Sequence, residues 1–151
     1  MRTRMPKAQD DLVQALARAR DLKPRLEAAA DELNRSIEAV ESTLSNMQLG
    51  VRASITMESL DEDGWSRDLT FGKESRTWRL LIEDGFSDPE MPHSTTPLLN
   101  CSREIRLNAA ELLPDLVRKM VATAEEEIRR VETATAMARK VAAALSSEEP
   151  K

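Results

Sequence analysis

The chain has 151 residues, of which 40% are hydrophobic and 32% are charged, and its formal net charge is −5. This length fits a single elongated domain, and the high charge fits long solvated helices. With 3% aromatic residues and one cysteine, we expect a small aliphatic core and neither an internal disulfide nor a multi-cysteine zinc site.

The sequence predicts a protein of the cytoplasm. No stretch contains the roughly 20 apolar residues of a membrane span. The basic first residues are not followed by the apolar run of a secretory signal. Sixteen arginines against six lysines, together with 19 alanines, indicate a bacterial source with a GC-rich genome.

The first long helix is predicted over residues 7–49, after a flexible segment at residues 1–6. Between Leu26 and Met47 the apolar residues recur at alternating steps of four and three, which is the seam of a coiled coil and requires a partner helix. The phase of this pattern is the same on both sides of Pro24, so we expect one helix that is kinked near that proline. Gly50 is expected just after its last turn.

Residues 50–84 change to a period of two. Apolar and polar residues alternate over residues 51–58, 65–71 and 76–83, and turn-forming residues occupy 61–64 and 72–75. This pattern predicts a three-stranded antiparallel β-meander with one apolar face. Another element must cover that face.

The rest of the chain is predicted to be a loop and two further helices. Residues 85–98 hold three prolines and the only histidine, and are expected to be a loop. A short helix over residues 100–113 would cover the sheet. Pro114 suits the first position of a new helix, so a separate long helix is predicted over residues 114–146, before a tail at 147–151. Its seam again steps by four and three, through Val117, Val121, Ala124, Ile128, Val131, Thr135, Ala138, Ala142 and Leu145.

The predicted fold class is α+β and mainly α: a long antiparallel helical hairpin, forming a coiled-coil stem, with an inserted three-stranded antiparallel β-meander and a short helix. In this hairpin, residues near 48 lie opposite residues near 114. Its alanine-rich seams bury little area, so a second apolar stripe is expected to join two hairpins as a homodimeric four-helix bundle. The alternative is that these alanines only favour helix formation. The predicted oligomer interface consists of Ala15, Leu22, Ala29, Ala134, Met137 and Val141.

No motif indicates catalysis, and we expect no metal and no cofactor. The four glycines are not grouped into a phosphate loop, and no metal-ligand spacing occurs. His93 and Cys101 are eight residues apart, and nothing in the sequence positions them as a catalytic pair. The protein is therefore expected not to be an enzyme.

The leading functional hypothesis is a non-enzymatic interaction, adaptor or chaperone-like protein, in which the stem mediates oligomerisation and the β-rich part binds a protein partner. The predicted partner-binding residues are Leu81, Phe86, Met91 and Leu98. The order of long helix, β insert and long helix is similar in outline to prefoldin-type chaperone subunits, without a shared motif. The extra short helix and the proline-rich loop lie outside the prefoldin pattern.

Two alternatives remain open from the residues alone. One is binding of nucleic acid by the basic N-terminal end, where residues 1–25 hold seven basic side chains against three acidic ones. No segment is basic enough to indicate nucleic-acid binding by itself, and this end is the only candidate. The other is a small-ligand site or an enzyme pocket near Cys101 and His93. The basic residues in question are Arg2, Arg4, Lys7, Arg18 and Arg20.

Overall fold

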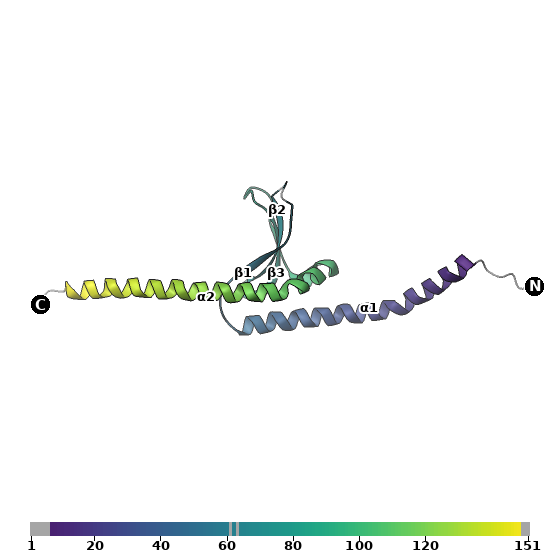
Figure 1. Cartoon of the computed structure of the whole chain (residues 1–151), viewed down its shortest axis with the longest axis horizontal. Coiled ribbons are helices and arrows are strands. Elements are labelled where there is room, and N and C mark those ends of the chain that lie inside the picture. Colours follow the sequence, from purple (N-terminus) through teal and green to yellow (C-terminus); the bar gives the residue numbers. More distant parts are fainter. Residues whose placement is uncertain (1–6, 61, 63, 149–151) are drawn as a thin grey trace, which may run out of the picture. The chain divides into compact units, whose positions relative to one another are not determined.

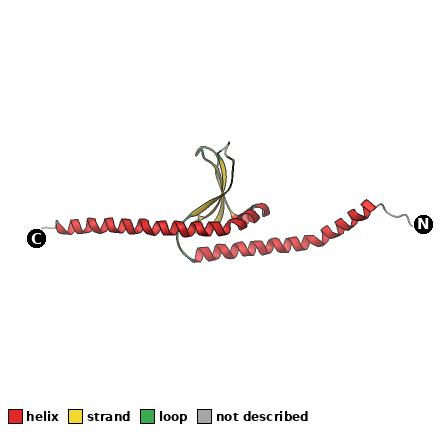
Figure 2. Cartoon of the chain, in the orientation of Figure 1, coloured by secondary structure: helices red, strands yellow, loops and turns green. Residues whose placement is uncertain are grey.

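The computed structural model describes residues 7–60, 62 and 64–148, and its contacts divide the chain into two compact units, Met1–Val40 and Glu41–Lys151. Its elements follow in the order α1, β1 to β4, a 3-10 turn η1 (Leu98–Asn100) and α2. Two long helices and one antiparallel sheet confirm the predicted α+β, mainly α class (Figure 2). The antiparallel pairing of the two helices into a hairpin is not confirmed.

Helix α1 runs from Lys7 to Asn46 without a break at Pro24. This confirms one helix rather than two, and Figure 1 shows α1 curving in its N-terminal half. The helix ends earlier than the predicted residue 49. Gln48 takes a left-handed backbone with φ of 52°, ahead of Gly50 with φ of 66°, and a residue in this conformation closes a helix.

The sheet contains the three predicted strands as β1 (Ala53–Leu60), β2 (Trp65–Glu74) and β3 (Thr77–Phe86). A fourth strand, β4 (Ser94–Pro97), pairs with β3, so the order is β1-β2-β3-β4 with every neighbour antiparallel. We call this sheet the head. The predicted loop over residues 85–98 is therefore wrong at both ends, because β3 extends to Phe86 and β4 begins at Ser94.

The turn between β2 and β3 also lies later than the sequence predicted. Gly72 stays in the strand opposite Arg79, and Glu74 pairs with Thr77. A two-residue turn remains, in which Ser75 and Arg76 have φ of 49° and 71°. Two successive positive φ angles match the twist of a tight hairpin. Of the other predicted turn, Asp61 and Asp63 lie outside the described residues.

The core lies between one face of the head and the first half of α2. The strand register puts Ala53, Leu69, Phe71, Leu80 and Ile82 on the same face, and all are buried. From the helix, Ala109, Leu116 and Met120 are buried as well. This confirms that a helix C-terminal to the sheet covers its apolar face, as expected for a half-apolar meander.

Helix α2 is a single helix from Arg103 to Ser147 and contains Pro114. The predicted short helix over residues 100–113 and long helix over residues 114–146 are therefore one element. Pro114 removes one backbone hydrogen bond, but Ala109 before it and Leu116 after it are both buried, and this packing holds the helix together. The head rises from the first half of α2, and the second half extends beyond it (Figure 1).

Candidate interaction surface

The main surface feature is an apolar seam on α2 that the described part of the chain leaves exposed. We give the name α2 seam to its large apolar residues, whose exposed fractions lie between 38% and 65%: Val117, Val121, Ile128, Val131 and Leu145. From Glu125 to Glu148 every residue is exposed. A helix without tertiary packing is marginally stable in water. An apolar stripe on such a helix therefore indicates a surface that another element covers.

The α2 seam forms one wall of a groove within the second unit. Leu49 and Val51, between α1 and β1, line this groove together with Ala124, Ile128 and Val131, and its volume is about 400 Å³. Residues near 48 were predicted to lie opposite residues near 114. The structure instead brings Leu49 and Val51 to residues 124–132, so the predicted register is wrong.

Acidic side chains flank the α2 seam beside this groove. Glu127 and Glu132 line the groove, and Glu125 is the neighbouring flanking position in the heptad. Glu127 accepts from Arg130 at 3.1 Å, in an exposed pair one turn apart. The groove therefore combines an apolar floor with a negative rim.

The first unit presents a second exposed apolar stripe. Leu12, Leu16, Leu22 and Leu26 of α1 are each more than 40% exposed, whereas Ile37 is buried. All six residues predicted to form an oligomer interface are exposed on α1 and α2, so they are accessible, and the interface itself stays a prediction.

The basic residues proposed for nucleic-acid binding fall partly outside the described structure. Lys7, Arg18 and Arg20 are exposed on α1. Arg2 and Arg4 lie outside the described residues. Exposure alone does not test nucleic-acid binding, and the basic end stays a sequence-based alternative.

Two of the four predicted partner-binding residues are buried and are withdrawn. Leu81 is 3% exposed because it lies within the sheet, paired with Thr70 on one side and Pro97 on the other. Leu98 is fully buried in η1. Phe86 is half-buried at the end of β3, and Met91 is exposed in the loop before β4. Phe86 and Met91 therefore remain accessible to a partner.

The end of the head that carries Phe86 is more apolar than the sequence suggested. Leu60, Trp65 and Phe86 are register partners across three adjacent strands. Leu60 is exposed, and the Arg67 guanidinium lies over the Trp65 ring, 5.4 Å from its centroid. Sequence reasoning missed this row because strand pairing, rather than sequence spacing, brings the three side chains together.

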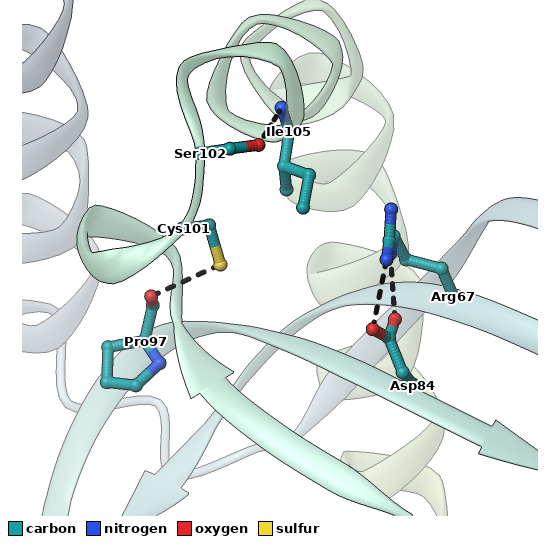
Figure 3. Close-up of polar contacts among 6 residues, drawn as sticks. All are labelled: Arg67, Asp84, Pro97, Cys101, Ser102 and Ile105. Atoms are coloured by element: carbon teal, nitrogen blue, oxygen red, sulfur yellow. Dashed lines mark hydrogen bonds and ion pairs between the residues drawn. The ribbon is translucent and has the colours of Figure 1, made fainter.

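Cys101 is half-buried and hydrogen-bonded, beside an ion pair (Figure 3). Its thiol donates to the Pro97 carbonyl at 3.5 Å, and burial, reinforced by the Asp84 charge, raises the pKa of the thiol. Arg67 donates to both carboxylate oxygens of Asp84, at 2.8 and 3.1 Å, which raises the pKa of the Arg67 guanidinium. A thiol held neutral in this way lacks the depressed pKa of a nucleophile.

His93 lies elsewhere, over Gly85, and lines a cavity of about 290 Å³ that does not include Cys101. The structure therefore does not bring the two residues together as a dyad. Glu83, in the same cavity wall, accepts hydrogen bonds from Arg52 and from the Thr70 hydroxyl, and Oδ1 of Asp68 is buried without a partner. This polar pocket was not predicted, because its residues come from four separate segments.

Among residues 7–60, 62 and 64–148, no group of three or more His, Cys, Asp or Glu side chains is arranged to hold a metal ion. In the same part of the chain, neither helix combines the length and apolar character needed to cross a membrane. Comparison with protein-family models, with curated proteins and with solved structures gives no match for this chain.

Proposed function

We propose that this chain is a non-enzymatic interaction protein that associates with another helix through the α2 seam. The observation that supports the proposal is the exposure of apolar residues at heptad spacing over the half of α2 beyond the head. A free helix of this kind gains little from propensity alone, so its stability has to come from packing against a partner. A seam with alternating steps of four and three is the pattern that a second helix covers.

The head has two roles in this proposal. Its core residues hold the first half of α2, and the Leu80 N–H, beyond the end of β4, donates to Glu41 Oε2 at 2.9 Å, which ties the end of α1 to the sheet. The helix that carries the seam is therefore attached to a rigid base. The exposed end of the head, with Leu60, Phe86 and Met91, is the surface we assign to a protein partner.

Sizing chromatography with light scattering on the full chain tests the α2 seam. Ile128→Lys places a charge on the seam. It is expected to reduce the mass and to raise the dissociation constant of the association roughly 100-fold. Thr133→Lys places the same charge on the outer face of α2 and should leave the mass unchanged.

A monomer at every concentration would exclude self-association through the seam. An equal loss of mass in both variants would show that the added charge, and not the seam, is responsible. Ile128→Lys is expected to keep the folded head, because Ile128 is more than half exposed in the single chain. The helicity of residues 125–147 should fall with the loss of the partner, since an unpacked helix is marginally stable in water.

A further inference from the structure

We propose that the partner on the α2 seam is the N-terminal half of α1 from a second copy of this chain, packed antiparallel. This inference rests on the proposed function and names its partner. In a symmetric pair, α1 of each copy would lie on α2 of the other, which closes the assembly at two copies.

The charge beside the α2 seam selects a basic partner helix. Glu125, Glu127 and Glu132 occupy flanking positions and are exposed. Two α2 seams packed in parallel would bring Glu127 of one copy beside Glu132 of the other, since these positions pair in parallel coiled coils. Like charges at flanking positions disfavour that pairing.

The basic exposed stripe in the described chain is the first half of α1. Leu12, Leu16 and Leu26 provide the apolar face, and all are at least half exposed. Arg20 occupies a flanking position of that face, and Lys23 replaces an apolar residue in the seam itself. Residues 7–25 hold five basic and three acidic side chains.

One antiparallel register aligns three apolar layers and two pairs of opposite charge. With Leu16 level with Val131, Ala19 comes level with Ile128 and Leu26 with Val121. The remaining layer in this stretch places Lys23 level with Ala124. In an antiparallel coiled coil, the flanking position e of one helix lies beside position e of the other, and position g lies beside position g.

In this register two pairs of flanking residues have opposite charge. Arg20 meets Glu125, and Glu27 meets Arg118. Glu27 and Arg118 already have exposed partners on their own helices, at 3.8 Å from Lys23 and at 2.7 Å from Asp115. In residues 7–60, 62 and 64–148, neither Arg20 nor Glu125 is in an ion pair. The Arg20–Glu125 pair is therefore the informative one to exchange.

A charge exchange tests the partner and the register together. Arg20→Glu and Glu125→Arg are each expected to raise the dissociation constant about 3- to 10-fold, because each creates like charges at two symmetric places. The double variant should return to within about 2-fold of the original chain. Arg18→Glu and Glu126→Arg, which carry the same charge changes away from the seam, are the matched controls and should have little effect.

Disulfide trapping separates a second copy from a hairpin within one chain. In a Cys101→Ala background, a chain with Leu16→Cys is mixed with a longer, tagged chain carrying Val131→Cys, and the mixture is oxidised mildly. A disulfide between the two chains supports the inference. If a chain that carries both substitutions forms only an internal disulfide, and the mixture forms none, the partner is the same chain and the inference is wrong.

The remaining outcomes distinguish this inference from the proposed function. If Ile128→Lys abolishes association but the Arg20 and Glu125 exchange shows no coupling, the α2 seam has a different occupant, and only the inference fails. If Ile128→Lys and Thr133→Lys both leave the mass of an oligomer unchanged, the α2 seam is not the interface, and the proposed function fails with it.

Discussion

Truncation of two neighbouring residues of α2, Leu116 and Val117, should affect different properties. Leu116 faces the head, so its loss should lower the stability of the single chain. Val117 belongs to the α2 seam, so its loss should mainly weaken association. Leu116 is fully buried, whereas Val117 is 38% exposed. Leu116→Ala removes three buried carbon groups at about 0.8 kcal/mol each and leaves a cavity. The free energy of unfolding should therefore fall by about 3–4 kcal/mol.

Val117→Ala removes two carbon groups from a side chain that is already partly in water, which costs about 1 kcal/mol. The higher helix propensity of alanine offsets about half of that loss. The net fall in the free energy of unfolding of the single chain should stay below about 1 kcal/mol. The association constant, in contrast, should fall for Val117→Ala, because the valine contributes to the seam.

The assay is urea denaturation followed by circular dichroism, at a protein concentration below the dissociation constant so that association does not contribute to stability. Light scattering on the same samples at higher concentration reports association. The reasoning would be refuted if Val117→Ala destabilised the single chain as much as Leu116→Ala. A loss of less than about 1 kcal/mol for Leu116→Ala would also refute it.

Three further substitutions test the head, each by denaturant unfolding. Asp84→Asn should lower the free energy of unfolding by about 1–2 kcal/mol, because it removes a part-buried, two-bond ion pair with Arg67; an unchanged midpoint would contradict this. Gly85→Ala should cost about 1–3 kcal/mol, since a Cβ there overlaps the His93 ring, and adding His93→Ala should recover part of the loss if that overlap is the cause. Arg76→Gly should stabilise the hairpin by about 0.5–1 kcal/mol by relieving a positive φ, and a destabilised variant would show that the turn is not strained.

The long helices could be predicted from the sequence because their apolar residues repeat with helical spacing over many turns. The prediction of one helix through Pro24 was correct, since the phase of the apolar pattern is the same on both sides. The prediction of a new helix at Pro114 was wrong. Its sequence context suits a helix start, and only tertiary packing shows that the chain stays helical through it. Burial of Ala109 and Leu116 against the head is a long-range effect that local spacing does not contain.

The three longer strands of the head could be predicted from the sequence, but its edge strand β4 could not. The segment 94–97 is short and polar and ends in proline, so no alternation marks it as a strand. Once β4 is added, Leu81 lies between two neighbouring strands and is buried, although its place in the alternation assigned it to the outer face. The polar pocket of Asp68, Glu83 and His93 was invisible for the same reason, because strand pairing assembles it.

The candidate interaction surface could also be predicted only in part. Heptad spacing identified the α2 seam and its stripe of apolar residues, and the structure shows both exposed. The spacing carried no information on which helix covers the seam. The groove with Leu49 and Val51, and the acidic rim beside it, supplied the charge argument for that choice.

Hydrogen exchange of the α2 backbone tests the central claim most directly, because it reports on the half of the helix that the single chain leaves uncovered. If another helix packs on the α2 seam, amides from residues 125–147 will exchange slowly at high protein concentration. The protection should decline on dilution and be lost in Ile128→Lys, while amides near Leu116 stay protected throughout. Rapid exchange over residues 125–147 at every concentration, with no difference between the original chain and Ile128→Lys, would contradict the account.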